Sequence, residues 1–352
     1  MESEIIMEEW SPVCNIQAFV EKTDKTYYFY LWINPESEEP EIRSCWICNR
    51  VEAPRQVDMT EFGNGQAPRM PVEYVAHDKK GIDLDEDLLE ILWFEEGDAA
   101  ALLSDDKILA VIPCFSGYNN FHGYSFFAEG TGPFAWEMKQ AYKHFEEKVA
   151  FCKKFWNYFD TEYWFEVQES HLKTLENFFG TNEKYYAIDG GNFPPKALIT
   201  GRKDGVIYGI TVGVSMIPMP KVEMSYQDNY TEYRRMELGF ACTEEKEELM
   251  KSMLGTISGL TNLPWRELTF LGHGHTIPIS HIDGYQYILF LNANEMQESA
   301  PKYDTFWSER INLLWLKLIK EEEYQCVCEK GVAAYLDDYK ADSIHVMKTG
   351  VE

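Results

Sequence analysis

The sequence lacks any run of about 18 apolar residues, the length that a membrane-spanning helix requires, so no such helix is expected. Its first ten residues, MESEIIMEEW, are acidic and lack the basic start and apolar core of a signal peptide. We therefore expect a cytoplasmic protein. The local motifs of serine hydrolases, zinc peptidases, P-loop proteins and dinucleotide-binding folds are absent too, although a fold can assemble a Ser/His/Asp site from distant residues.

Positive charge is also scarce. The 352 residues include 32 Lys and Arg against 59 Asp and Glu, a net charge of −27. Residues 1–137 hold nine Lys and Arg against 27 Asp and Glu, a net charge of −18. Nucleic acid and anionic membranes need clustered basic residues, so neither is an expected partner. The acidity either attracts a basic protein partner or keeps the protein soluble, and the sequence leaves both interpretations open.

Cysteine pairs give little sign of a metal or redox centre. The eight cysteines are scattered, which favours small buried side chains in a reducing compartment over a disulfide framework. Cys45 and Cys48 form CWIC, but a thioredoxin-type pair needs its first cysteine at a helix N-terminus, whereas this one lies in a β-rich run. A second CxxC for structural zinc is missing. We expect both thiols to be unpaired and no cofactor to be bound.

The fold class follows from β-rich runs that alternate irregularly with helical segments. An apolar content of 45% and a length of 352 residues predict about two packed domains. We expect an α+β fold of two lobes, each a mixed or antiparallel sheet with flanking helices, divided into an acidic lobe at 1–137 and a second domain at 138–352. The long helix after that boundary could belong to either side. The main expected strands are 12–33 (a hairpin), 42–49, 107–115, 206–215, 234–242 and 285–293. The expected helices are 85–96, 136–159, 166–180 and 244–260, and 306–319 is either a helix or a long core segment.

Two clusters in the first lobe are candidate partner-binding residues. The acidic turn in WFEEGDAAALL contains Glu95, Glu96 and Asp98, for which we favour a solvated turn over a cation or acid/base site. These acids could also form part of a face for a basic partner. The loop GYNNFHGYSFF offers large aromatic contact area on an adaptable backbone, unless its rings are core between the lobes. Its candidate partner-binding residues are Tyr118, Phe121, His122 and Tyr124.

The histidines of GHGHTIP form a third candidate cluster. His273 and His275 would lie on one face of an extended strand and, with His281, could supply three nitrogen ligands for zinc. Leu271 and Ile277 would share that face, which favours packed, hydrogen-bonded histidines without metal.

Three stretches carry a resemblance to the suppressor-of-fused domain family. They are VIYGITVGVSMIPMP, YRRMELGFACTEE and LPWRELTFLGHGHTIPIS, and the resemblance covers roughly residues 165–300. The GHTIP core of the third stretch is the most specific. The motif residues are Gly272, His273, Gly274, His275, Thr276 and Pro278. SCWICN, WFEEGDAAALL and LAVIPCFSGYNNFHGY resemble the region that precedes this domain in bacterial members.

The resemblance implies a suppressor-of-fused-like C-terminal lobe in a protein that binds and sequesters other proteins and is not an enzyme. Bacterial relatives have been proposed as immunity proteins of polymorphic toxin systems, so a toxin or regulatory protein, possibly basic, is the expected partner. Two alternatives stay open. One is an enzyme that uses His273, His275 and nearby carboxylates, and the other is a scaffold or regulatory binder without a toxin partner.

Overall fold

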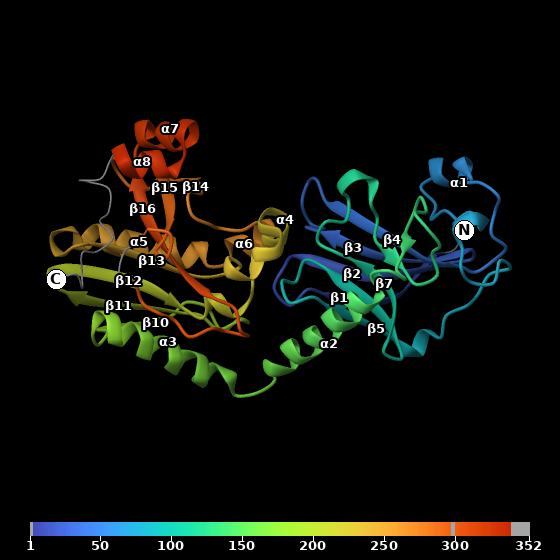
Figure 1. Cartoon of the computed structure of the whole chain (residues 1–352), viewed down its shortest axis with the longest axis horizontal. Helices are drawn as coiled ribbons and strands as arrows, with labels where there is room; N and C mark the ends of the chain where they lie inside the picture. The colour runs from blue at the N-terminus through green and yellow to red at the C-terminus, as the bar shows by residue number, and fades with distance from the viewer. Residues whose placement is uncertain (1–2, 297–299, 339–352) are drawn as a thin grey trace. The chain divides into compact units, whose positions relative to one another are not determined.

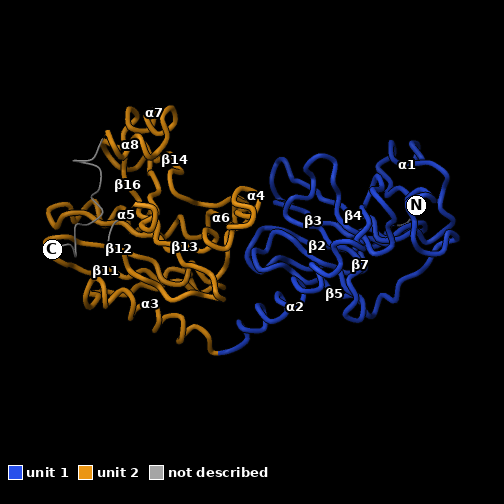
Figure 2. Tube along the Cα trace, viewed as in Figure 1, with its two compact units in different colours: residues 1–161 blue, residues 162–352 orange. Residues whose placement is uncertain are grey.

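A computed structural model describes residues 3–296 and 300–338. The chain forms two compact units, residues 1–161 and 162–352 (Figure 2). Both combine antiparallel or mixed sheets with flanking helices, so the predicted α+β class is confirmed. Among the described residues, no helix is long and apolar enough to cross a membrane. The helix after the predicted boundary near residue 137 lies with unit 1, and the boundary itself stays a prediction.

Unit 1 contains two sheets and one long helix (Figure 1). Its four-stranded antiparallel sheet has the order β1-β2-β3-β4, and its five-stranded sheet has the order β5-β6-β7-β8-β9. The first sheet consists of β1 (Ser3–Trp10), β2 (Ile16–Thr23), β3 (Thr26–Ile33) and β4 (Glu41–Asn49). The second consists of β5 (Leu89–Trp93), β6 (Ala100–Ser104), β7 (Lys107–Ile112), β8 (Tyr124–Ser125) and β9 (Trp136–Glu137). The helices are α1 (Met59–Gly63) and α2 (Tyr142–Tyr158).

The core of unit 1 follows from alternation along the strands. In β2, Ile16, Ala18 and Val20 are fully buried, while the residues between them are partly exposed. β3 and β4 pack against β7, and α2 covers the five-stranded sheet with a buried face of Phe145, Val149 and Cys152. The predicted hairpin at 12–33 and strand at 42–49 are therefore confirmed as β2, β3 and β4.

Unit 2 is built on one seven-stranded mixed sheet with the order β10-β11-β12-β13-β16-β15-β14 (Figure 1). Among the paired strands that the structure describes in this sheet, β13 and β16 run parallel to each other and the other neighbours run antiparallel. The strands are β10 (Lys184–Ala187), β11 (Ala197–Lys203), β12 (Val206–Val212), β13 (Arg235–Thr243), β14 (Thr276–Pro278), β15 (Tyr287–Asn292) and β16 (Ile311–Ile319). The helices are α3 (Tyr163–Phe179), α4 (Val222–Tyr226), α5 (Glu247–Leu260), α6 (Leu263–Glu267), α7 (Glu321–Lys330) and α8 (Val332–Asp338).

The helices α3 and α5 cover opposite faces of this sheet. The ring of Tyr208 stacks on Phe179 of α3, with centroids 4.5 Å apart. A Cβ on the next strand residue, Gly209, would lie 2.5 Å from Leu254 Cδ2 of α5. Successive strand residues face opposite sides of a sheet. The contacts of Tyr208 with α3 and of Gly209 with α5 therefore place the two helices on opposite faces. The helix α3 ends at Gly180, whose φ of 86° gives the glycine C-cap that the sequence indicated.

One expected helix is a strand, because residues 85–96 contain β5, preceded only by a short 3-10 turn. The segment 306–319, left open between a helix and a long core segment, contains the buried strand β16. In β16 every residue is buried, since both faces of the sheet are covered there, so neither the period of 2 nor that of 3.6 appears in its sequence.

Candidate partner-binding surfaces

Phe121 is the centre of the aromatic loop in unit 1. Its side chain is 5% exposed. Its ring centroid lies 5.4 Å from Phe115, 5.0 Å from Tyr124 and 4.8 Å from Trp136. A buried ring with three aromatic neighbours holds those neighbours in place.

Around this centre, three side chains reach solvent: Tyr118 is 52% exposed, and Phe115 and Trp136 are each 37% exposed. We call Phe115, Tyr118 and Trp136 the aromatic patch. The backbone beneath it is tightly bonded, since Gly117 N–H donates to the Phe121 carbonyl at 2.8 Å and Phe121 N–H donates to the Tyr118 carbonyl at 3.0 Å. Gly117 has a φ of 93°, in the region that favours glycine. The patch is therefore a fixed platform of exposed rings.

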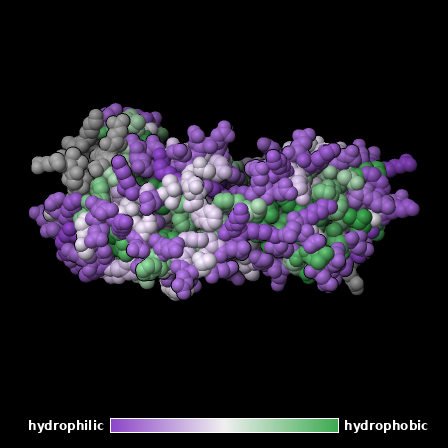
Figure 3. Space-filling model, turned by 60° about the horizontal axis from the view of Figure 1, so that its bottom comes forward, coloured by the Kyte–Doolittle hydropathy of each residue, from purple (hydrophilic) through white to green (hydrophobic). Residues whose placement is uncertain are grey.

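The other predicted loop residues support this platform. Tyr124 stands 5.2 Å from Phe145 of α2, and burial raises the pKa of its phenol. His122 is half-buried and its pKa is lowered, mainly by burial, although a hydrogen bond to the Ser44 backbone acts in the other direction. Of the four predicted loop residues, only Tyr118 presents a large exposed face. On the side drawn in Figure 3, apolar residues of unit 1 gather among hydrophilic ones.

The acidic turn is buried, so the preference for a solvated turn was wrong. Glu95, Glu96 and Asp98 are 1%, 8% and 1% exposed. Lys148 of α2 places its Nζ 2.7 Å from Glu95 Oε1 and 3.6 Å from Glu96 Oε2. Glu95 and Glu96 face inward because they pair with Lys148 of α2, a helix more than 40 residues further along the chain. In this position they hold α2 against the sheet and do not present a face to a partner.

Exposed acids lie elsewhere, in the segment that leads into β4 and at its first residue. Glu36, Glu38, Glu39 and Glu41 are all exposed. Glu41 Oε1 accepts a hydrogen bond from Arg43 Nε at 2.7 Å, and Arg43 Nη1 donates to the Cys114 carbonyl at 3.1 Å. That arrangement brings the Glu41 carboxylate beside Gly117, at the base of the aromatic patch. The run ESEEPE was the sequence signal for these acids, but their neighbourhood to the loop depends on the fold.

The histidines of GHGHTIP lie in a turn that leads into β14, so their placement on one face of a strand was wrong. His273 Nδ1 accepts a hydrogen bond from the Asn292 N–H at 3.1 Å, and His275 Nδ1 lies 3.3 Å from the Phe270 carbonyl, to which it donates. Burial lowers the pKa of both rings. His281 bonds instead to Thr256 Oγ1 at 2.7 Å. Across residues 3–296 and 300–338, no three His, Cys, Asp or Glu side chains are placed to hold a metal.

The glycines of this motif shape the turn. Gly274 has a φ of 86°, and a Cβ on it would lie 3.1 Å from Val332 Cγ1 of α8. Beyond the turn, Thr276 pairs with Leu289 and Pro278 pairs with Tyr287 at the end of the sheet. Gly272 and His273 line a very small pocket together with aromatic residues such as Tyr226 and Phe270. The motif therefore leads into β14, the edge strand of the sheet, and lies against α8 at Gly274.

Glu237, in the stretch MELGF, is the centre of a buried polar network. Its Oε1 accepts hydrogen bonds from the N–H groups of Gly213 and Ser215, both at 3.0 Å, and from Ser215 Oγ at 2.7 Å. Its Oε2 accepts from Thr211 Oγ1 at 2.6 Å. Burial acts to raise the pKa of this carboxyl, but the hydrogen bond from His171 and those from the hydroxyls leave it below the usual range. Glu237 thus ties the stretch VGVSM to the stretch MELGF.

This network has the composition of a hydrolase site but not its access. Ser215, His171 and Glu237 are at most 4% exposed. His171 Nε2 lies 3.1 Å from Ser215 Oγ and 3.3 Å from Glu237 Oε1, so the carboxylate contacts the serine directly as well as the histidine. A substrate carbonyl has no room to approach the hydroxyl. The network stabilises the bend and is not an exposed catalytic centre.

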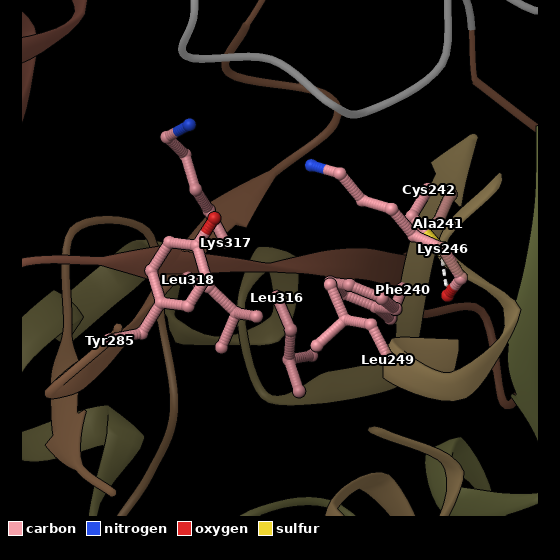
Figure 4. Close-up of a pocket in the computed structure, with 9 residues that line it drawn as sticks. All are labelled: Phe240, Ala241, Cys242, Lys246, Leu249, Tyr285, Leu316, Lys317 and Leu318. Carbon is pink, nitrogen blue, oxygen red and sulfur yellow. Dashed lines mark hydrogen bonds between the residues drawn. The ribbon is translucent and has the colours of Figure 1, made fainter. Parts of the chain in front are cut away.

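A separate small apolar pocket lies beside α5 (Figure 4). Leu249, Leu316 and Leu318 form much of its wall, and the ammonium groups of Lys246 and Lys317 extend away from them toward one side (Figure 4). Cys242, on the same wall, has a pKa raised to about 11 by burial, and its Sγ lies 3.6 Å from the Lys246 carbonyl. The thiol is therefore protonated at neutral pH and unsuited to act as a nucleophile.

Together these features define a chain of two α+β units, with exposed aromatic and acidic residues on unit 1 and motif-bearing turns that stabilise unit 2. Residues 193–349 match the family of the Suppressor of fused protein (SUFU), which confirms the resemblance seen in the sequence over that range. No curated protein matches the chain.

Two solved structures are similar to half of this chain. A SUFU (suppressor of fused protein) homologue from Neisseria gonorrhoeae FA 1090 shows 12% identity and a TM-score of 0.34, covering 50% of this chain and 90% of its own. A chain of a Sufu–Fu complex shows 11% identity and a TM-score of 0.36, covering 50% of this chain and 84% of its own.

Proposed function

We propose that this chain binds and sequesters a protein partner through the aromatic patch of unit 1, and that the partner is a toxin which it neutralises. The observation that carries the proposal is the patch itself. Tyr118 is 52% exposed, whereas Phe121, whose ring packs against Phe115 and Trp136, is 5% exposed. Exposed aromatic side chains on a rigid base are typical of binding hot spots, because little conformational entropy is lost when a partner covers them.

The charge of unit 1 supports a basic partner. Residues 1–161 hold 14 Lys and Arg against 30 Asp and Glu, a net charge of −16. The exposed acids at 36–41 take the place of the buried Glu95, Glu96 and Asp98 as the charged part of the interface. Such a field raises the association rate and is screened over about 8–10 Å at physiological salt. In this proposal the aromatic patch accounts for most of the binding affinity, and the exposed acids increase the association rate.

Replacement of Tyr118 and Trp136 with alanine tests the patch. We expect the loss of an anchoring ring to cost about 2 kcal/mol, which is about 30-fold in Kd, and to appear mainly as faster dissociation. Neutralisation of Glu36, Glu38 and Glu39 to glutamine should instead slow association. Phe165→Ala is a matched control, since Phe165 is 70% exposed on α3 of unit 2.

The measurement is surface-based binding kinetics with a partner that co-purifies with the tagged protein from its native cell. Unchanged kinetics in the aromatic double variant, or an equal loss with Phe165→Ala, would refute the patch. The immunity role has its own test, in which the partner alone is expressed in a host cell. If the partner slows growth and this chain restores it, the toxin assignment holds, whereas a harmless partner contradicts it.

A further inference from the structure

The strand β1 is an open edge of the four-stranded sheet in unit 1. Within the described chain it pairs with β2 alone, and the sheet order ends with it. Each of its eight residues is exposed or half-buried. An edge strand presents a row of backbone N–H and C=O groups that can bond to one more strand. Native proteins cover such edges, guard them with charged residues or β-bulges, or use them to bind a partner, and β1 has a bulge between Ile5 and Met7.

The outer face of this edge carries two exposed apolar side chains, with Glu8 between them. Ile5 is 56% exposed and Trp10 is 50% exposed. Both lie on the outer face, because they pair with Glu21 and Gln17, whereas Ala18 and Val20 between those residues face the core. A row of paired residues continues from Trp10 across the sheet through Gln17 and Trp32 to Ile42, which is 56% exposed.

The charged residues of the edge are all acidic. Glu4, Glu8 and Glu9 are exposed, and none of the three forms a salt bridge within the described residues. Burial and the neighbouring Glu90 raise the pKa of Glu9, against the effect of a hydrogen bond with Trp93. If two copies of β1 paired, carboxylates would face carboxylates, which is unfavourable. A strand rich in Lys or Arg would instead place positive charges beside the carboxylates of β1.

We propose that β1 accepts an extended basic segment of the partner protein as a fifth strand of this sheet. The proposal rests on the proposed protein-binding function and adds a second contact with its own chemistry. Glu4 and Glu9 lie on the core-side face, since they pair with Lys22 and Ala18, and Ile5 and Trp10 lie on the outer face. Glu8 pairs with Phe19 and lies on the outer face between Ile5 and Trp10. The segment therefore carries basic residues that reach carboxylates on both faces and apolar residues beside Ile5 and Trp10.

The test uses the full chain and an eight-residue peptide in which lysine alternates with valine or threonine. A matched peptide carries glutamate in place of lysine. Hydrogen exchange followed by mass spectrometry should show slower exchange in residues 3–10 with the lysine peptide alone. The triple variant Glu4→Gln, Glu8→Gln and Glu9→Gln should weaken the lysine peptide at least ten-fold.

Glu244 and Glu245, in the turn before α5, and Glu248, in its first turn, are exposed acids of unit 2, so their triple change to glutamine is the control. Equal protection by both peptides, no protection by either, or equal weakening in the control triple would overturn the edge assignment. If the lysine peptide does not bind but the partner still binds through Tyr118 and Trp136, the proposed strand addition at β1 is refuted and the proposed function is not. Loss of the patch effect refutes the proposed function and leaves peptide binding to be judged separately.

Discussion

The Glu237 network allows one prediction to be worked through in magnitude. The carboxylate accepts four hydrogen bonds from Thr211, Gly213 and Ser215, and a fifth group, His171 Nε2, lies 3.3 Å from it. A hydrogen bond to a charged group contributes about 1.5–3 kcal/mol, and a buried donor left without an acceptor costs about 1–3 kcal/mol. Glu237→Ala orphans several donors at once and should cost more than about 4 kcal/mol, enough to threaten the folding of unit 2.

Glu237→Gln is the more informative change. The glutamine amide oxygen can take the place of Oε1 and accept the hydrogen bonds from Gly213 and Ser215. Its nitrogen then takes the place of Oε2 and donates to Thr211 Oγ1, because a hydroxyl can accept as well as donate. The shape is then retained and only the charge is lost. We expect a loss of about 2 kcal/mol at pH 7. Glu248→Gln, at a side chain that is 88% exposed, should change stability by less than about 0.5 kcal/mol.

The pH dependence has a definite sign. The pKa of Glu237 is lowered in the folded state, so its contribution is present above the unfolded value of 4.5 and is lost as pH falls through the folded pKa. The Gln variant should lack this part of the acid sensitivity. Because the chain has two units, hydrogen exchange of β13 amides is a better assay than one global melting curve. A Gln variant as stable as wild type at pH 7, with an unchanged acid response, would refute the reasoning.

Three further outcomes are expected. Lys148→Met should destabilise unit 1 by about 3 kcal/mol in urea unfolding, because it removes the cation that pairs with the Glu95 carboxylate, which is 2% exposed. Lys143→Met, at a side chain that is 85% exposed, should have little effect, and equal effects of the two changes would contradict the buried pair. Cys45 and Cys48 should react with a thiol reagent only after denaturation and without reductant, since both are buried and burial raises their pKa values; failure to label would indicate a disulfide. His275→Ala should leave the metal content of the purified protein unchanged, as measured by elemental analysis, and loss of stoichiometric zinc would contradict the hydrogen-bonded placement.

The two units illustrate different limits of prediction from sequence. The hairpin of β2 and β3 was predictable because its alternation reports one buried face. The strand β16 was not, because each of its residues is buried and a continuous apolar run fits helix and strand equally. The aromatic loop could be found from its composition, but not the fact that Phe121 is the buried support and Tyr118 the exposed ring.

By itself, the sequence determined the α+β class, the acidity of the first unit and the family resemblance that residues 193–349 confirm. Periodicity, charge and motif identity are local properties, so they can be read along the chain. Only the tertiary structure decided that Glu95 is buried against Lys148, that Glu41 lies beside Gly117, and that Glu237 bonds to Ser215. Each of these depends on segments distant in sequence, and burial against a distant element is the physical property that no local pattern contains.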